Sequence, residues 1–230
     1  MSDAVMKIEG SHQEEVSDKG LLKRLDLAAK RGVDIVASGL GLLLLSPLFA
    51  GVALWIKWDS KGPVFYRQRR VGKDEKDFDV FKFRSMLNDS DKDGFITIGG
   101  HDPRVTKAGY YIRKYKIDEL PQLINVFIGN MSLVGPRPQV RKYVDMYNEE
   151  QLKVLEAKPG ITDPASIYYR HESEILGEVE NPEEYYVNVI MPHKLGLCRD
   201  YIKRRNVFTD IKVIFDTFRA VAQKKSGGKS

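Results

Sequence analysis

The sequence predicts an α+β, mostly helical protein that enters a membrane from one side, which is a monotopic arrangement. The prediction rests on a long uncharged apolar run, on basic residues at both ends of that run, and on the short strands and amphipathic helices that follow. We expect an N-terminal re-entrant helix–break–helix and then a globular domain with a small β-hairpin and amphipathic surface helices. The predicted parts are a polar tail (1–20), the membrane helix (21–58), the globular domain (59–222) and a flexible basic tail (223–230).

The composition fits a single medium-sized domain. The chain has 230 residues, 42% of them hydrophobic and 30% charged, so it can bury a substantial core. A net charge of +5 suits nucleic acid, anionic lipid headgroups or phosphorylated substrates equally well. The single cysteine, Cys198, excludes an intramolecular disulfide, and the four scattered histidines show no zinc-binding spacing.

The apolar run extends from Ile35 to Ile56 without a charged residue. As a helix it would be about 33 Å long, close to the thickness of the hydrocarbon core of a bilayer. A long polar segment precedes the run and no small-residue cleavage site follows it, so it is not a cleaved signal peptide. The chain is therefore expected to contact a membrane.

Two features of this run favour a re-entrant helix. Ser46-Pro47 lies in its middle, where proline removes a backbone donor and predicts a sharp kink, and Ser46 or packing would have to satisfy the freed backbone groups. Lysines and arginines flank both ends, as is typical of cytoplasmic flanks. A kinked spanning helix with its N-terminus outside is the alternative, and a buried core helix of a soluble protein is the third interpretation.

Further elements follow from periodicity and turn residues. Residues 63–68 and 78–86 read as two short strands of a hairpin, and residues 88–102, rich in Asp and Gly, read as a loop. The last helix is strongly amphipathic, and either packs on the core or lies in the membrane interface. The predicted helices cover residues 107–116, 118–128, 141–157 and 207–221.

The adjacent carboxylates Asp118 and Glu119 are the first candidates for chemistry. Arg113 lies just upstream, and Arg137 follows between two prolines that hold its backbone stiffly. Such cations favour ionised carboxylates and bind phosphate, so one carboxylate could attack phosphorus while the other helps to hold Mg²⁺. The structural alternative is an ordinary helix start, with Asp as cap and Pro121 in the first turn.

A second candidate is the segment from Phe81 to Met86, where aromatic and basic residues alternate. Lys82 and Arg84 could bind phosphate, although a half-buried strand with a cationic face explains the pattern equally well. The sequence has no Walker A motif, no G-x-G-x-x-G after a strand and no G-x-S-x-G. These absences argue against P-loop NTPases, dinucleotide-binding dehydrogenases and typical α/β-hydrolases.

Taken in order, the motifs GPVFYRQRRVG, FDVFKFRSM, DELPQL, SLVGPRP and KPGIT resemble those of the bacterial sugar transferases, the monotopic polyprenyl-phosphate phosphoglycosyl transferases. The resemblance is strong over residues 30–162 and weaker to about residue 220. Since no large membrane domain precedes these motifs, we expect the chain to belong with the small members. DELPQL and SLVGPRP at this spacing are highly specific for the family.

The resemblance implies a function and a place in the cell. Asp118 would attack the β phosphorus of a UDP-sugar with Glu119 as its partner, release UMP, and pass the phosphosugar to polyprenyl phosphate, expected to be undecaprenyl phosphate. Mg²⁺ would be held by Asp118. Both ends of the membrane helix would lie at the cytoplasmic face of the bacterial inner membrane. The implied phosphate-binding residues are Arg113, Lys82 and Arg84, and the implied nucleotide-binding loop is Pro136-Arg137-Pro138.

Some questions stay open. Many relatives continue the KPGIT motif with Gly-x-Ala-Gln, whereas this chain has Asp163-Pro164-Ala165-Ser166, so no sugar specificity is carried over. The competing functions are a non-catalytic membrane scaffold of the same fold and a direct glycosyltransferase that releases UDP. A nucleic-acid partner is not expected, because it would leave the apolar run unexplained, and the sequence does not decide whether the protein forms a homodimer.

Overall fold

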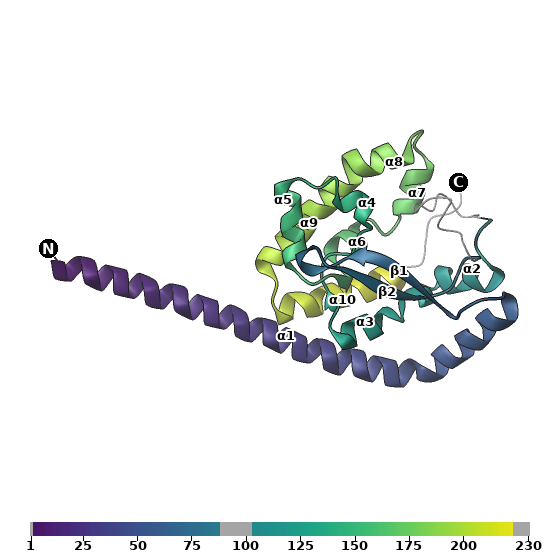
Figure 1. Cartoon of the computed structure of the whole chain (residues 1–230), viewed down its shortest axis with the longest axis horizontal. Coiled ribbons are helices and arrows are strands. Elements are labelled where there is room, and N and C mark those ends of the chain that lie inside the picture. The colour runs from purple at the N-terminus through teal and green to yellow at the C-terminus, as the bar shows by residue number, and fades with distance from the viewer. Residues whose placement is uncertain (1, 88–102, 223–230) are drawn as a thin grey trace.

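A computed structural model describes residues 2–87 and 103–222, with side chains from residue 25 onward. The described chain is mostly helical, with two small sheets of two strands each. Figure 1 shows one long helix, α1, with a globular body on one side of its C-terminal half. The predicted loop at residues 88–102 and the predicted basic tail at 223–230 lie outside the described residues.

Helix α1 (Ser2–Asp59) is continuous, so the expected interruption at Ser46-Pro47 does not occur. The Ser46 hydroxyl donates to the carbonyl of Leu43 at 2.8 Å. This carbonyl lies four residues before Pro47, so it is the group that the missing proline N–H would have bonded. Serine therefore satisfies the freed acceptor and the helix curves instead of breaking (Figure 1). The predicted polar tail is also part of α1, which begins at Ser2.

The apolar part of α1 is accessible over most of its surface. The stretch Leu25–Asp59 is long and apolar enough to cross a membrane, with a mean hydropathy of 2.1, and only 11% of its most apolar window is buried in the protein. Leu43, Leu44 and Trp58 are among its exposed side chains. A core helix of a soluble protein would be mostly buried, so this interpretation is disfavoured.

The predicted hairpin is confirmed. Strand β1 (Phe65–Val71) pairs antiparallel with β2 (Asp77–Phe83) across the turn η1 (Lys73–Glu75). The register places Tyr66 opposite Lys82 and Arg70 opposite Phe78. Phe83 is buried and packs against Val52 and Ile56 of α1, so the end of the hairpin is anchored on the membrane helix.

Helix α2 (Lys107–Lys114), the turn η3 (Ile117–Glu119) and α3 (Gln122–Ile128) follow close to the predicted positions. The strands β3 (Ser132–Val134) and β4 (Gly160–Thr162) pair in parallel. Gly135, just after β3, and Gly160, the first residue of β4, cross so closely that a Cβ on Gly160 would lie 2.1 Å from the backbone nitrogen of Gly135. Only glycine fits at this crossing.

The predicted helix over residues 141–157 is wrong, because the chain divides it into three short pieces. Asn148 starts a new helix with a reciprocal capping box to Gln151. The predicted C-terminal helix is confirmed as α10. The elements of this part are α4 (Arg141–Val144), α5 (Glu149–Leu152), η4 (Lys153–Glu156), α6 (Pro164–Tyr168), α7 (Glu172–Gly177), α8 (Pro182–Tyr185), the π-turn η5 (Tyr186–Ile190), α9 (Met191–Arg204) and α10 (Val207–Ala222).

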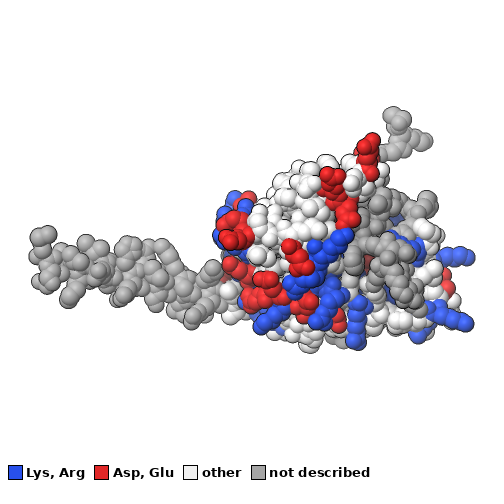
Figure 2. All heavy atoms as spheres, turned by 45° about the horizontal axis from the view of Figure 1, so that its top comes forward, with Lys and Arg blue, Asp and Glu red and all other residues white. Residues whose placement is uncertain are grey.

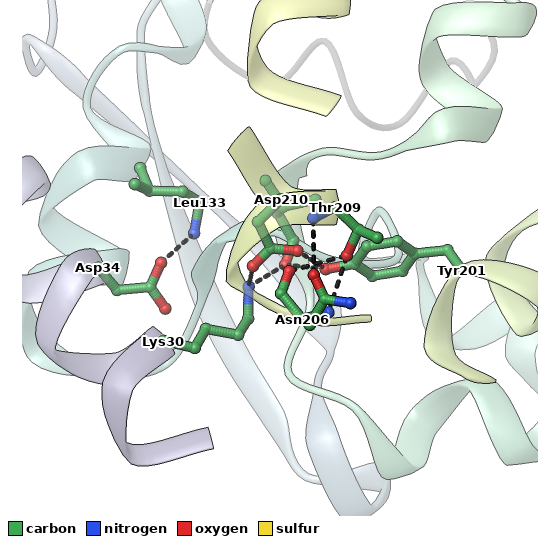
Figure 3. A network of polar contacts seen from close by, with 8 residues as sticks. Lys30, Asp34, Leu133, Tyr201, Asn206, Thr209 and Asp210 are labelled. Carbon is green, nitrogen blue, oxygen red and sulfur yellow. Dashed lines mark hydrogen bonds and ion pairs between the residues drawn. The ribbon is translucent and has the colours of Figure 1, made fainter. Parts of the chain in front are cut away.

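Polar contacts attach the beginning of the apolar part of α1 to the body. Lys30 forms a largely buried ion pair with Asp210 of α10 and donates to the carbonyl of Val134 at 3.0 Å. One turn later, Asp34 accepts from the backbone N–H of Leu133 at 3.0 Å. In Figure 3 both α1 side chains point toward β3 and α10, where Tyr201 also bonds to Asp210.

Candidate active site

The carboxylate pair lies on a tight turn between two helices. Lys116 has a left-handed backbone conformation (φ 58°, ψ 22°), which ends α2 and starts the turn η3 that carries Asp118 and Glu119. A non-glycine residue in this region is uncommon and often marks a functional site. Pro121, whose missing N–H suits a helix start, then leads into α3. The two carboxylates are therefore held on a short turn rather than inside a helix.

Asn125 of α3 fastens this turn to the hairpin. Its side-chain Oδ1 accepts from the backbone N–H of Phe81 at 2.9 Å, and its Nδ2 donates to the carbonyl of Asp79 at 2.7 Å. The amide thus bonds to β2 in the way a neighbouring strand would, and it is fully buried. This contact brings Lys82, the next residue of β2, into the electrostatic environment of Asp118 and Glu119.

Arg137 contacts the second carboxylate of the pair, Glu119. Its guanidinium donates to both oxygens of Glu119, and the Nη1–Oε2 distance is 3.2 Å. Such a two-point contact fixes the carboxylate in the plane of the guanidinium. The flanking prolines hold the backbone of Arg137, and the carbonyl of Pro138 accepts from Arg70 at 3.3 Å. The structure therefore brings the predicted Pro136-Arg137-Pro138 loop to the predicted carboxylates.

Asp118 is left without such a partner. Its Oδ1 is buried and has no hydrogen-bond partner among the described residues. Burial, and then the neighbouring charge of Glu119, raises the pKa of Asp118, while Lys82, Lys116 and Arg113 oppose the increase. A buried carboxylate oxygen without a hydrogen bond costs stability, and such groups with a shifted pKa are typical of functional sites.

The pKa of Glu119 moves in the opposite direction. Burial alone would raise it, but the charge of Arg137, together with Lys82 and the Arg137 hydrogen bond, lowers the pKa of Glu119 well below its usual value. Burial, opposed by Glu119 and assisted by the nearby arginines Arg137 and Arg70, lowers the pKa of Lys82 to about 8. Two adjacent carboxylates with opposite shifts are typical of residues with different roles in one site.

Arg84, which was predicted to bind phosphate, is placed at the end of α1. Its guanidinium donates to the carbonyl of Ile56 in the last turn of α1 at 3.4 Å, and to the carbonyls of Ser60 at 2.7 Å and Lys61 at 2.8 Å just beyond the helix, and so caps the end of α1. Burial lowers the pKa of Arg84 and Asp59 opposes the decrease. Of the two basic residues in the alternating segment 81–86, only Lys82 therefore lies in the site.

Arg70 belongs to the site and was missed by the sequence interpretation. Burial and the nearby Arg137 lower the pKa of Arg70 to about 10, opposed in part by Tyr186, Tyr66 and Glu119. Strand alternation is a signal that could have found it, because Arg70 shares a face of β1 with Tyr66 whereas Arg69 lies on the other face beside Asp77.

The carboxylate pair can also accept a metal ion. Among residues 25–87 and 103–222, no three His, Cys, Asp or Glu side chains cluster in the manner of an all-protein metal cage. The free Oδ1 of Asp118 is a hard oxygen donor of the kind that Mg²⁺ prefers. Because Mg²⁺ usually takes one or two carboxylates and completes its shell with water and substrate phosphates, this small donor set fits it.

The surface charges of the body are mixed. On the face drawn in Figure 2, basic and acidic side chains lie next to one another. Nucleic acid would favour a continuous basic surface. The drawn face therefore gives no support to nucleic-acid binding.

Comparisons with known proteins agree with this site. The chain is 36% identical over 196 residues to "UDP-N-acetylgalactosamine-undecaprenyl-phosphate N-acetylgalactosaminephosphotransferase" of Aeromonas hydrophila, with 84% of this chain and 43% of the relative covered. It is 42% identical over 205 residues to "Undecaprenyl-phosphate glucose phosphotransferase" of Komagataeibacter xylinus, with 86% and 36% covered. It therefore spans about two fifths of the length of these relatives.

A relative of similar length is "Exopolysaccharide production protein ExoY" of Rhizobium meliloti (strain 1021). The two are 31% identical over 219 residues, which covers 89% of this chain and 90% of the relative. The pattern of the family described as bacterial sugar transferase matches residues 25–224, so the match includes the apolar part of α1, the carboxylate pair and the Arg137 loop. The chain therefore belongs to the bacterial sugar transferase family.

Proposed function

We propose that this chain transfers a sugar 1-phosphate from a UDP-sugar to undecaprenyl phosphate through a phosphosugar intermediate on Asp118. The observation that carries the proposal is the contrast between the two carboxylates. Glu119 is fixed by two bonds from Arg137. Asp118, beside Lys82, Lys116 and Arg113, keeps a buried oxygen for which the described part of the chain supplies no hydrogen-bond partner. The neighbouring cations can balance the negative charge of a diphosphate, so a carboxylate in this position can attack its phosphorus.

The reaction divides into two displacements at one phosphorus. A carboxylate oxygen of Asp118 forms a bond to the β phosphorus of the UDP-sugar, and the bond from that phosphorus to the bridging oxygen breaks, so UMP leaves. An oxygen of the lipid phosphate then attacks the same phosphorus, and the carboxylate of Asp118 is released. The products are UMP and a polyprenyl diphosphate sugar. This would be the first membrane step in the synthesis of a bacterial glycoconjugate.

The surrounding cations would stabilise both displacements. Phosphoryl transfer depends mainly on positioning and on charge stabilisation, and Lys82, Arg113 and the loop of Arg137 supply cations beside the carboxylate pair. We propose that Asp118 also holds Mg²⁺, which would neutralise charge on the diphosphate. Glu119 stays ionised beside Arg137, where it fixes the loop that would receive the nucleotide.

The names of the relatives support the substrates. Two relatives are named for undecaprenyl phosphate and for transfer of a sugar phosphate, one of them with a UDP-sugar. The named sugars differ, N-acetylgalactosamine in one and glucose in the other, so these names assign no sugar to this chain.

We also propose that α1 is re-entrant, with both ends at the cytoplasmic face of the inner membrane. The two ends of its apolar part contact the same body: Lys30 and Asp34 at one end, and Asp59, which accepts from the N–H of Ala108, at the other. A helix that spanned the bilayer would separate these ends by the whole hydrocarbon core. The curve of α1 and the Ser46 bond support the same placement.

Cysteine labelling tests this topology. The native Cys198 is first replaced by serine, and single cysteines are then introduced at Leu27 and at Trp58. An impermeant maleimide should label both positions in inverted inner-membrane vesicles and neither in intact spheroplasts. Labelling of one position from each side would instead establish a spanning helix.

Nucleotide release tests the reaction. The full chain in detergent or nanodiscs is incubated with a panel of UDP-sugars and Mg²⁺, with and without undecaprenyl phosphate. We compare the parent, Asp118→Asn and the matched control Asp145→Asn, which changes an exposed carboxylate remote in sequence from the pair. Intact-mass measurement without the lipid detects a phosphosugar adduct, and peptide mapping locates it.

The outcomes separate the candidate functions. Lipid-dependent release of UMP by the parent and by Asp145→Asn, lost in Asp118→Asn, would support the two-step transfer. Release of UDP would indicate direct glycosyl transfer. A folded, membrane-bound parent that releases no nucleotide from any sugar would favour a non-catalytic scaffold.

A further inference from the structure

Asp163 is a buried carboxylate that the proposed reaction does not use. It follows β4 and is 1% exposed. Its Oδ1 accepts from the backbone N–H of Ser166 at 2.8 Å and so caps α6. Its Oδ2 accepts from the Ser166 hydroxyl at 2.8 Å and from the backbone N–H of Arg137 at 3.1 Å. The last contact joins Asp163 to the active site.

The backbone of the Arg137 loop depends on this contact. Pro136 and Pro138 have no N–H, so Arg137 has the only backbone donor in the tripeptide. The backbone N–H of Gly135, just before the tripeptide, bonds to the carbonyl of Thr162 at 3.0 Å. Without Asp163, the N–H of Arg137 would lose its partner in a half-buried loop.

We propose that Asp163 is a positioning residue that fixes the backbone of Arg137 and thereby holds its guanidinium on Glu119. The inference rests on the proposed function for its kinetic consequences, but not for its structural ones. Asp163 accepts a hydrogen bond from the backbone N–H of Arg137, and the side chain of Arg137 makes the two-point contact with Glu119. A loop free to move would weaken that contact, and the charge balance of the carboxylate pair would change with it.

The test compares two variants of Asp163 with one control in the full chain. Asparagine keeps an oxygen to cap α6 but cannot accept at both former oxygen positions, so a bond to Arg137 or to Ser166 is lost. Asp163→Ser is the second variant, because serine can still cap a helix but is too short to reach Arg137 in the same way. Asn148→Ala is the matched control, since it removes the cap of α5 without contacting the Arg137 loop.

Three measurements are made on each variant. Hydrogen exchange of the peptide that contains Arg137 reports the loop without any substrate. Separate kcat and KM values for UMP release report the site that the Arg137 loop completes. Thermal unfolding, followed by the fluorescence of the two tryptophans, reports whether the fold is intact.

We expect Asp163→Asn and Asp163→Ser to speed exchange at Arg137 about tenfold and to lower kcat/KM for the UDP-sugar about 10- to 100-fold, the effect of losing one charge-assisted hydrogen bond. Both variants should keep a cooperative thermal transition, and Asn148→Ala should change neither the exchange at Arg137 nor kcat/KM. Unchanged exchange at Arg137 and an unchanged kcat/KM, in either variant with a cooperative thermal transition, would overturn the inference. A parent that releases no UMP would refute the proposed function alone, because the exchange measurement would still test the loop.

Discussion

Replacing Lys30 by methionine removes the cation from the ion pair that joins α1 to α10. The side chains of Lys30 and Asp210 are only 12% and 10% exposed. Lys30 also donates to the carbonyl of Val134 at 3.0 Å, and Tyr201 bonds to the second oxygen of Asp210. Methionine has a similar length and fills the same space, so the change removes the charge and both hydrogen bonds but little of the packing.

The expected cost follows from the burial of the pair. Breaking one partner of a buried ion pair costs about 3–5 kcal/mol, and the residual exposure together with the remaining Tyr201 bond favours the lower end, about 3 kcal/mol. For a chain of this size that corresponds to a decrease in Tm of about 6–12 °C. The assay is thermal unfolding of the full chain in detergent, followed by the fluorescence of Trp55 and Trp58.

An exposed ion pair provides the matched control. Lys212 pairs with Asp216 at 2.7 Å within α10, and its side chain is 76% exposed. Lys212→Met should therefore change the free energy of unfolding by no more than about 0.5 kcal/mol. Lys30→Met combined with Asp210→Asn should be less destabilised than the sum of the two single variants, because the second change removes the unpaired charge. A decrease in Tm for Lys30→Met no larger than that for Lys212→Met would refute the reasoning.

Three further predictions follow from single residues. The parent should lose kcat/KM for the UDP-sugar as pH rises through about 8, where Lys82 loses its charge, and Lys82→Arg should retain that activity to higher pH; a pH–rate series checks both. Asn125→Leu should lower the free energy of unfolding by about 3 kcal/mol, because the N–H of Phe81 and a carbonyl of β2 lose their partner, and a thermal melt with no change would contradict this. Ser46→Ala should lower the free energy of unfolding by about 1 kcal/mol because the carbonyl of Leu43 loses its donor, and a Tm in detergent equal to that of the parent would argue that this carbonyl is satisfied in another way.

Local patterns predicted the elements that depend on local interactions. The hairpin followed from two alternating strands around a charged turn, and α10 followed from apolar residues at helical spacing. The helix over residues 141–157 was wrong although a local signal was present. Asn148 and Gln151 have the spacing of a capping box, which marks the start of a new helix. Apolar periodicity alone did not reveal this boundary.

Residues whose role depends on distant partners were predicted less well. Asp118, Glu119 and Arg137 were identified because the motifs are specific, and the structure brings Glu119 and Arg137 into direct contact. Arg84 was assigned to phosphate, yet it caps a helix that ends more than twenty residues earlier in the chain. Asn125 was not singled out, because nothing near it in sequence shows that its amide will bond to β2. Such pairings arise only when the chain is folded.

The curve of α1 and the geometry of the site are parts of one arrangement. Arg31 donates to the carbonyls of Val126 and Phe127 at 2.6 and 2.9 Å, so α1 caps the helix that begins just after the carboxylate pair. Asp34 bonds to β3, the strand that leads into the Arg137 loop. One turn of α1 therefore holds both halves of the Glu119–Arg137 contact. If α1 is re-entrant, the same turn sets the depth of the site, so its polar side chains would keep the carboxylate pair at the level where the phosphate of a lipid lies.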